Sequence, residues 1–190
     1  MIKKQLKNKS MSKIALKKEL NSFTKEQLVG QILELYDTYK QVKEYYKHYL
    51  NPQDESDLME KYKSIIVTEF YPKSNRIGDA RFSVAKKAIA DFRALHPSPD
   101  LLAELLVTLP EQACQFTHDY GDMSEQYYTS AANNFEVALK FLKKENLLDK
   151  FKSRCRGCVD NSECCGYGFR DDMEQLFDDY YPDLDPEPDE

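Results

Sequence analysis

Apolar residues recur at the spacing of an α-helix along most of this 190-residue chain, and no other feature constrains its fold as strongly. The clearest row places its members at offsets of 0, 4, 7 and 11, and it consists of Leu28, Ile32, Leu35 and Tyr39. Residues at such offsets lie on one face of a helix. Few apolar residues alternate with the period of two that marks a strand. The pattern therefore predicts an all-α protein.

Capping residues and prolines divide this pattern into eight or nine short antiparallel helices. These helices are expected near residues 12–20, 24–38, 39–50, 54–70, 82–95, 98–121, 124–142, 147–151 and 173–180. The second and third are either one helix or two joined at a bend near Asp37, and Pro110 either kinks or splits the sixth. Residues 153–168 are expected to form an irregular loop rich in cysteine and glycine. Short helices with short connections predict a bundle or a short α-solenoid-like fold.

A chain of this length supports one well-buried core, so a single helical domain over residues 12–181 is expected, with two small domains as the alternative. Residues 1–11 form a basic extension predicted to be disordered, with Met11 as an alternative start, and residues 182–190 form an acidic, proline-rich tail predicted to be disordered. Residues 1–20 carry seven lysines and one glutamate, whereas residues 171–190 carry ten carboxylates and no basic residue. Such ends are either solvated or attracted to each other or to partners of opposite charge.

Composition excludes several classes of protein. No stretch approaches the ~20 apolar residues of a membrane span, and no apolar segment follows the lysine-rich start as in a secretory signal. A net charge of −6 makes a nucleic-acid partner unlikely. Five cysteines, an odd number, without an export signal indicate reduced thiols and a cytoplasmic location.

Four of the five cysteines gather in one segment and are the candidate metal ligands Cys155, Cys158, Cys164 and Cys165. The C-x2-C spacing of the first two lets both thiolates reach one tetrahedral zinc ion, and a further ligand from the second pair is feasible. The arginines at positions 154 and 156 would favour the thiolate form. Adjacent cysteines rarely both bind one ion, so an ordinary loop with incidental thiols is the favoured interpretation. Zinc binding and a reversible disulfide are the alternatives. No cofactor is therefore expected, with zinc as the alternative.

Cys114 and His118 lie four residues apart in a predicted helix, with Asp119 beside them. This spacing suits a thiolate–imidazole pair or half of a metal site. The alternative is a small buried cysteine and a surface histidine near the C-terminal end of the helix, where a positive charge is favourable. An enzyme of unrecognised class would have its active site here.

Thirteen tyrosines and no tryptophan are present, with doublets at Tyr45-Tyr46, Tyr127-Tyr128 and Tyr180-Tyr181. Neighbours on a helix point about 100° apart, so each doublet is expected to straddle the edge of a buried face. Exposed tyrosine pairs would instead anchor a protein partner.

The motifs of nucleotide-binding loops, zinc proteases and serine hydrolases are missing. The sequence therefore favours a non-enzymatic helical module that binds another protein. A small zinc-binding protein and an enzyme of unrecognised class are the alternatives, and the oligomeric state is left open.

Five short motifs resemble those of a family of uncharacterised bacterial helical proteins. They are Leu16–Leu20 (LKKEL), Phe23–Leu28 (FTKEQL) with the run Ile32–Tyr36, Val42–Tyr46 (VKEYY), Leu50–Pro52 (LNP) and Gly166–Phe169 (GYGF). The similarity covers residues 12–181. It implies a helical fold and assigns neither an activity nor catalytic residues.

Overall fold

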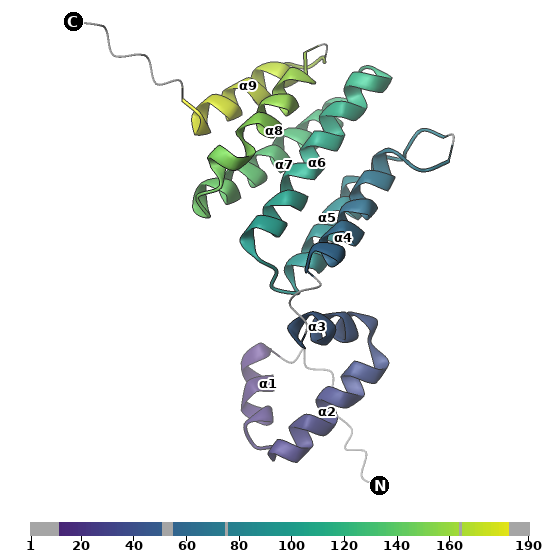
Figure 1. Ribbon diagram of the computed structural model, residues 1–190, viewed down its shortest axis with the longest axis vertical. Coiled ribbons are helices and arrows are strands. Elements are labelled where there is room, and N and C mark those ends of the chain that lie inside the picture. The colour runs from purple at the N-terminus through teal and green to yellow at the C-terminus, as the bar shows by residue number, and fades with distance from the viewer. Residues whose placement is uncertain (1–11, 51–54, 75, 164, 183–190) are drawn as a thin grey trace, which may run out of the picture. The chain divides into compact units, whose positions relative to one another are not determined.

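The structure, a computed structural model, describes residues 12–50, 55–74, 76–163 and 165–182, and its regular elements are all helices (Figure 1). In order these are α1 (Lys13–Leu20), α2 (Lys25–Thr38), α3 (Lys40–Leu50), α4 (Glu55–Phe70), α5 (Phe82–Arg93), α6 (Pro99–Tyr120), α7 (Glu125–Lys144), α8 (Leu148–Asp160) and α9 (Phe169–Tyr180). The prediction of an all-α protein is confirmed. The predictions of disorder for residues 1–11 and for the tail beyond Pro182 lie outside the described residues.

The helix starts follow the capping residues that the sequence indicates. Ser12 accepts a hydrogen bond from the Ala15 N–H at 3.2 Å. Thr24 accepts one from the Gln27 N–H at 3.2 Å, and the Gln27 side chain accepts one from the Thr24 N–H at 2.9 Å. This reciprocal pair is a capping box. Tyr39 has extended dihedral angles (φ −114°, ψ 121°) and separates α2 from α3, so the second and third segments are two helices.

The chain divides into two compact units, residues 1–50 and 51–190. The predicted helical region 12–181 therefore contains two units, which are described separately below.

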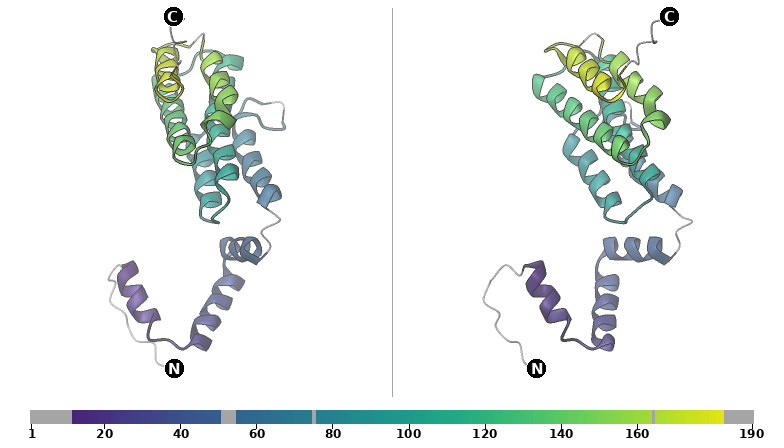
Figure 2. Two further views of the ribbon diagram at one scale, coloured as in Figure 1. Left: turned by 60° about the vertical axis from the view of Figure 1, so that its left-hand side comes forward. Right: turned by 90° about the vertical axis from the view of Figure 1, so that its left-hand side faces the viewer.

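In the second unit, consecutive helices pack as pairs and the pairs stack. α4 contacts α5, α6 contacts α7, and α8 contacts α9, while α6 also contacts α4 and α8, and α7 contacts α9. Figure 2 shows from two further directions how these helices lie side by side. Contacts between successive pairs are typical of a short α-solenoid, the second of the two predicted architectures.

The core of this unit is apolar and aromatic. Its largest fully buried side chains are Ile66, Phe70, Phe92, Leu105, Val107, Leu109, Phe135, Leu139, Leu142, Val159, Phe169 and Met173. α6 contributes most to this core, with twelve buried residues in one 22-residue helix. Pro110 lies inside α6 without splitting it, because the helix is continuous from Pro99 to Tyr120. No helix of the described residues is long and apolar enough to cross a membrane.

The prediction of a loop over residues 153–168 is wrong for its first half, since α8 extends to Asp160. Phe151, Cys155, Cys158 and Val159 are all buried and follow helical spacing. Cysteine here takes the place of a small apolar residue on the inner face of the helix. The C-x2-C spacing of Cys155 and Cys158 is therefore that of a buried helical face, which the metal-site interpretation overlooks.

The first unit has no comparable core. α2 and α3 contact each other, and the Tyr36 and Tyr46 rings lie 6.4 Å apart at 62°. None of the described residues between Ser12 and Leu50 is buried, the His48 side chain being outside this description. The apolar row predicted for α2 thus exists, and the described residues of this unit leave it largely exposed.

Candidate functional site

The two α8 cysteines lie one turn apart and are fully buried, each with a different partner. Cys155 lies beside Tyr181, which follows α9, and Cys158 lies beside Cys114 of α6. Burial raises the pKa of Cys155 to about 11, and the contact with Cys114 together with burial raises the pKa of Cys158 well above its ordinary value. A metal ligand or a nucleophile needs the thiolate form. These two thiols are held in the opposite, protonated form.

The two arginines expected to ionise these thiols bind carboxylates instead. Arg154 donates from Nε to Glu111 at 2.6 Å and from Nη1 to Glu104 at 2.5 Å. Arg156 donates to Asp160 and Glu174 at 3.2 and 3.3 Å. Their charges are therefore neutralised by partners other than the cysteines.

The remaining loop cysteines do not complete a site with α8 in the described residues. Cys165 is half-buried, and its Sγ lies 3.5 Å from Thr117 Oγ1. Cys164 lies outside the described part of the chain. Within that part, no group of three or more His, Cys, Asp or Glu residues is placed to hold a metal ion. Zinc binding by the 155–165 segment stays a prediction.

The second candidate pair, on α6, divides between two environments. Cys114 is fully buried and contacts Cys158, whereas His118 is exposed near the C-terminal end of the helix. The fold places Cys114 against Cys158 of α8, a contact that the sequence does not predict. An active site built on Cys114 and His118 stays a prediction without a described pocket that both residues line.

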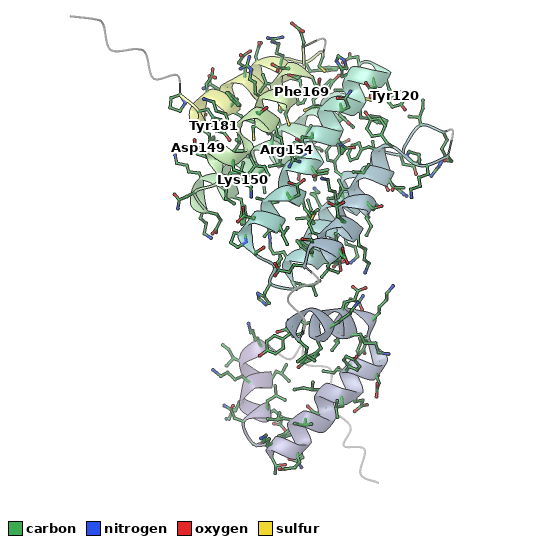
Figure 3. The ribbon with its side chains drawn as sticks, viewed as in Figure 1. Tyr120, Asp149, Lys150, Arg154, Phe169 and Tyr181 are labelled. Carbon is green, nitrogen blue, oxygen red and sulfur yellow. The ribbon has the colours of Figure 1, made fainter. Side chains whose placement is uncertain are left out.

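A network of charged side chains spans α4, α6 and α8. Lys63 donates to Glu104 at 2.7 Å, and Arg154 bridges Glu104 and Glu111. Burial alone would raise the pKa of Glu104, but the hydrogen bond from Lys63 and the charge of Arg154 outweigh it and lower that pKa. Figure 3 shows Arg154 in the middle of this unit. Beside it lies a hollow of about 260 Å³ whose lining includes Gln115, Gly157 and Asn161.

These pairs tie successive helices of the stack together. Glu104 and Arg154 each have two oppositely charged partners, so the network links α4, α6 and α8.

Most of the exposed large apolar side chains on the described residues belong to the first unit, and α2 carries more of them than any other helix. We call the row Leu28, Ile32, Leu35 and Tyr39 the α2 apolar face. Leu28 is half-buried, while Ile32, Leu35 and Tyr39 are 40%, 46% and 52% exposed. A neighbouring row on the same helix is exposed as well and consists of Val29, Leu33 and Tyr36. A helix that is apolar on more than one side is normally buried.

Tyrosines from α3 extend this surface. The rings of Tyr45, Tyr46 and Tyr49 contact one another, with centroids 5.2 to 6.4 Å apart, and Tyr49 is 66% exposed. The ammonium group of Lys43 lies 5.8 Å from the Tyr36 ring. Tyrosines with wet hydroxyl groups are enriched where proteins bind one another.

The other two doublets straddle a buried edge, as the sequence predicted. Tyr128 and Tyr181 are buried, whereas Tyr127 and Tyr180 are only half-buried. The Tyr127 hydroxyl donates to the Ala113 carbonyl and the Tyr181 hydroxyl to the Leu148 carbonyl, each at 2.9 Å. These tyrosines have a packing role in the second unit.

Comparison with known proteins gives one match. A family described as "Family of unknown function (DUF6155)" matches residues 11–181, which is most of the chain and reaches into both units. No curated protein and no solved structure matches.

Proposed function

The chain belongs to DUF6155, a family of unknown function, and on this premise we propose that it is a helical protein-interaction module whose α2 apolar face receives an amphipathic helix of a partner protein. One observation carries the proposal: the described residues 12–50 form three helices with no buried residue, although α2 is apolar on two adjoining rows. The free thiols of the described cysteines support a cytoplasmic setting for this interaction.

The size of the uncovered row supports docking rather than incidental exposure. Leu28 to Tyr39 spans three turns of helix, about 16 Å at 1.5 Å per residue. Because Ile32 and Leu35 are 40% and 46% exposed, covering either one contributes on the order of 1 kcal/mol. Monomeric proteins rarely leave contiguous apolar patches of this kind open unless a partner covers them.

Charge indicates what kind of helix would fit. α1 and α3, which adjoin α2 in the chain, together carry six lysines and two glutamates. A partner helix with an apolar stripe and flanking aspartates or glutamates would match the stripe on α2 and the lysine-rich helices that precede and follow it in the chain. Such helix-in-groove binding uses anchors at the same i, i+4, i+7 spacing that the α2 apolar face presents.

The partner can be identified by placing a photo-crosslinking amino acid at Leu35, which is exposed, and identifying the captured protein by mass spectrometry. Calorimetry with the two purified proteins then measures affinity for the wild type, for Ile32→Ser/Leu35→Ser and for the control Val137→Ser. Val137 on α7 matches Leu35 in exposure, at 46% each. The double variant is expected to bind at least about tenfold more weakly, because truncated anchors at an interface each cost over 1 kcal/mol.

The control is expected to bind like the wild type, and added salt is expected to weaken binding because charged groups flank the apolar contact. Equal affinity of the double variant and the wild type would overturn the proposal. Crosslinks formed only to a second copy of the chain would also overturn it.

A further inference from the structure

The loop between α4 and α5 encloses an aromatic hollow on the second unit. Its volume is about 320 Å³, and its lining consists of Tyr71, Pro72, Ser74, Arg76, Ile77 and Tyr120. The rings of Tyr71 and Tyr120 lie 6.1 Å apart and are tilted by 33°. Tyr120 is 46% exposed and Ile77 is 59% exposed, so the apolar walls are open to solvent.

The walls of this hollow are held in place before any ligand arrives. The Tyr71 hydroxyl donates to Asp119 at 2.8 Å, and Gln115 donates to the other oxygen of the same carboxylate at 2.7 Å. The Phe116 ring lies beneath both tyrosines, with centroids 4.8 Å from Tyr120 and 5.9 Å from Tyr71. A rigid aromatic wall reduces the entropy lost on binding.

Among the described residues that line the hollow, Arg76 is the charged one. Its guanidinium is 65% exposed, and its ion pair with Asp79 is long, at 3.9 Å. Arg81, the next arginine along the chain, is held by Glu69 at 2.7 Å. An anionic group entering the hollow would therefore meet an exposed guanidinium that is only weakly paired.

We propose that this aromatic hollow binds residues 182–190 of a second copy of the chain. That segment, PDLDPEPDE, has three prolines and five acidic side chains. Proline-rich segments dock into aromatic-lined grooves, and acidic side chains complement the exposed Arg76 guanidinium. Figure 3 shows Tyr181, next to which the segment begins, and Tyr120 on opposite sides of this unit. Docking onto a second copy predicts self-association of the chain, whereas docking onto the same copy does not.

The test measures fluorescence anisotropy of a labelled PDLDPEPDE peptide titrated with the full chain. Tyr120→Ala and Arg76→Ala are each expected to weaken binding about tenfold, the effect of losing an aromatic or arginine anchor. Tyr167→Ala is the matched control, because Tyr167 is an exposed tyrosine (66%) outside the lining of this hollow. This variant is expected to bind the peptide as tightly as the wild type does. A peptide with Asn and Gln in place of Asp and Glu, and one with Ala in place of Pro, are both expected to lose binding.

Sedimentation of the full chain supplies the second readout. Concentration-dependent self-association is expected, and it should be lost both in Tyr120→Ala and in a chain that ends at Pro182. Failure of the wild type to bind the peptide, equal binding by Tyr120→Ala and wild type, or the absence of self-association would each overturn the proposal. Self-association that requires Ile32 and Leu35 instead would overturn it as well, and would place the contact on the α2 apolar face.

Discussion

At the scale of single residues, the C-terminal end of α4 is held by the carboxylate of Glu69 and by Gly78, which has no side chain to keep the backbone away. Glu69 is 8% exposed at its side chain and accepts hydrogen bonds from Arg81 Nε at 2.7 Å, from Arg81 Nη2 at 3.2 Å and from the Arg81 N–H at 3.1 Å. The hydrogen bonds from Arg81 hold the pKa of Glu69 below its usual range despite burial. Gly78 lies against the carbonyls of Glu69 and Phe70 in the same loop. The Glu69–Arg81 ion pair and the close approach of Gly78 together hold Gly78 and Arg81 against the end of α4.

Replacing Glu69 by Gln is expected to lower the free energy of unfolding at pH 7 by about 1.5–3 kcal/mol, the typical contribution of a hydrogen bond to a charged group. Because the folded-state pKa lies below the unfolded one, this stabilisation is present above the unfolded value of about 4.5. It is lost as pH falls through the folded-state pKa. Urea unfolding at pH 7 and at pH 3 measures both limits.

The matched control is Glu136→Gln on α7, whose ion pair with Lys140 lies at the surface and is expected to change stability by less than about 0.5 kcal/mol. If Glu69→Gln lowers the free energy of unfolding by the same amount at both pH values, the ionised carboxylate has no role in stability.

Replacing Gly78 by Ala is expected to destabilise the fold by about 1–3 kcal/mol, the range for overpacking. A Cβ at this position would lie 2.0 Å from the Phe70 carbonyl oxygen and 2.5 Å from that of Glu69, and neither backbone atom moves cheaply. Gly157→Ala in α8 is the control, since no atom lies within 4 Å of its added Cβ. That change is expected to stabilise by about 0.5–1 kcal/mol in thermal or urea unfolding. Equal effects of the two substitutions would contradict the close approach at Gly78.

At the scale of helices, the sequence predicts most starts and faces because caps and periodicity are local. Thr24 with Gln27 and the row from Leu28 to Tyr39 needed only neighbouring residues to be recognised. Two features depended on distant residues and were not predicted. One is the pairing of Cys158 with Cys114 across α8 and α6, and the other is the absence of a cover over α2. Periodicity tells which face of a helix is apolar, but not what packs against it.

The same reasoning explains the error in α8. Cys155 and Cys158 follow Phe151 at offsets of 4 and 7, which is the pattern of a buried face when cysteine counts as a small apolar residue. The aromatic hollow at Tyr71 and Tyr120 was also missed, because the two residues lie 49 positions apart and no local signal joins them. The only advance signal was the abundance of tyrosine.

Alkylation of the native protein by iodoacetamide, followed by mass spectrometry, tests the environment of the thiols. Cys114, Cys155 and Cys158 are expected to stay unmodified, because they are fully buried, whereas the half-buried Cys165 is expected to react. All three should become reactive in urea. Elemental analysis of the same sample tests the zinc alternative. One zinc ion per chain that is lost in Cys155→Ser/Cys158→Ser would contradict the conclusion that these thiols are protonated and structural.

At the scale of the whole molecule, charge and apolar surface are distributed unevenly between the two units. Residues 1–50 carry eleven lysines and five acidic side chains, whereas residues 51–190 carry an acidic excess and the extensive buried core. Complementary charge raises the rate of association and selects partners more than it raises affinity. The first unit therefore has the charge and the open apolar face of a docking element, and the second has the packing of a stable scaffold.

The most direct test of the α2 apolar face is the free energy of unfolding of Ile32→Ser/Leu35→Ser, measured by urea titration of the isolated protein. If the face is open and kept for a partner, the double variant should unfold within about 0.5 kcal/mol of the wild type, as surface substitutions do. Leu105→Ala, in the fully buried middle of α6, should cost about 2–5 kcal/mol in the same experiment. A comparable loss in the α2 variant would mean that its own chain already covers the face, and would contradict the account.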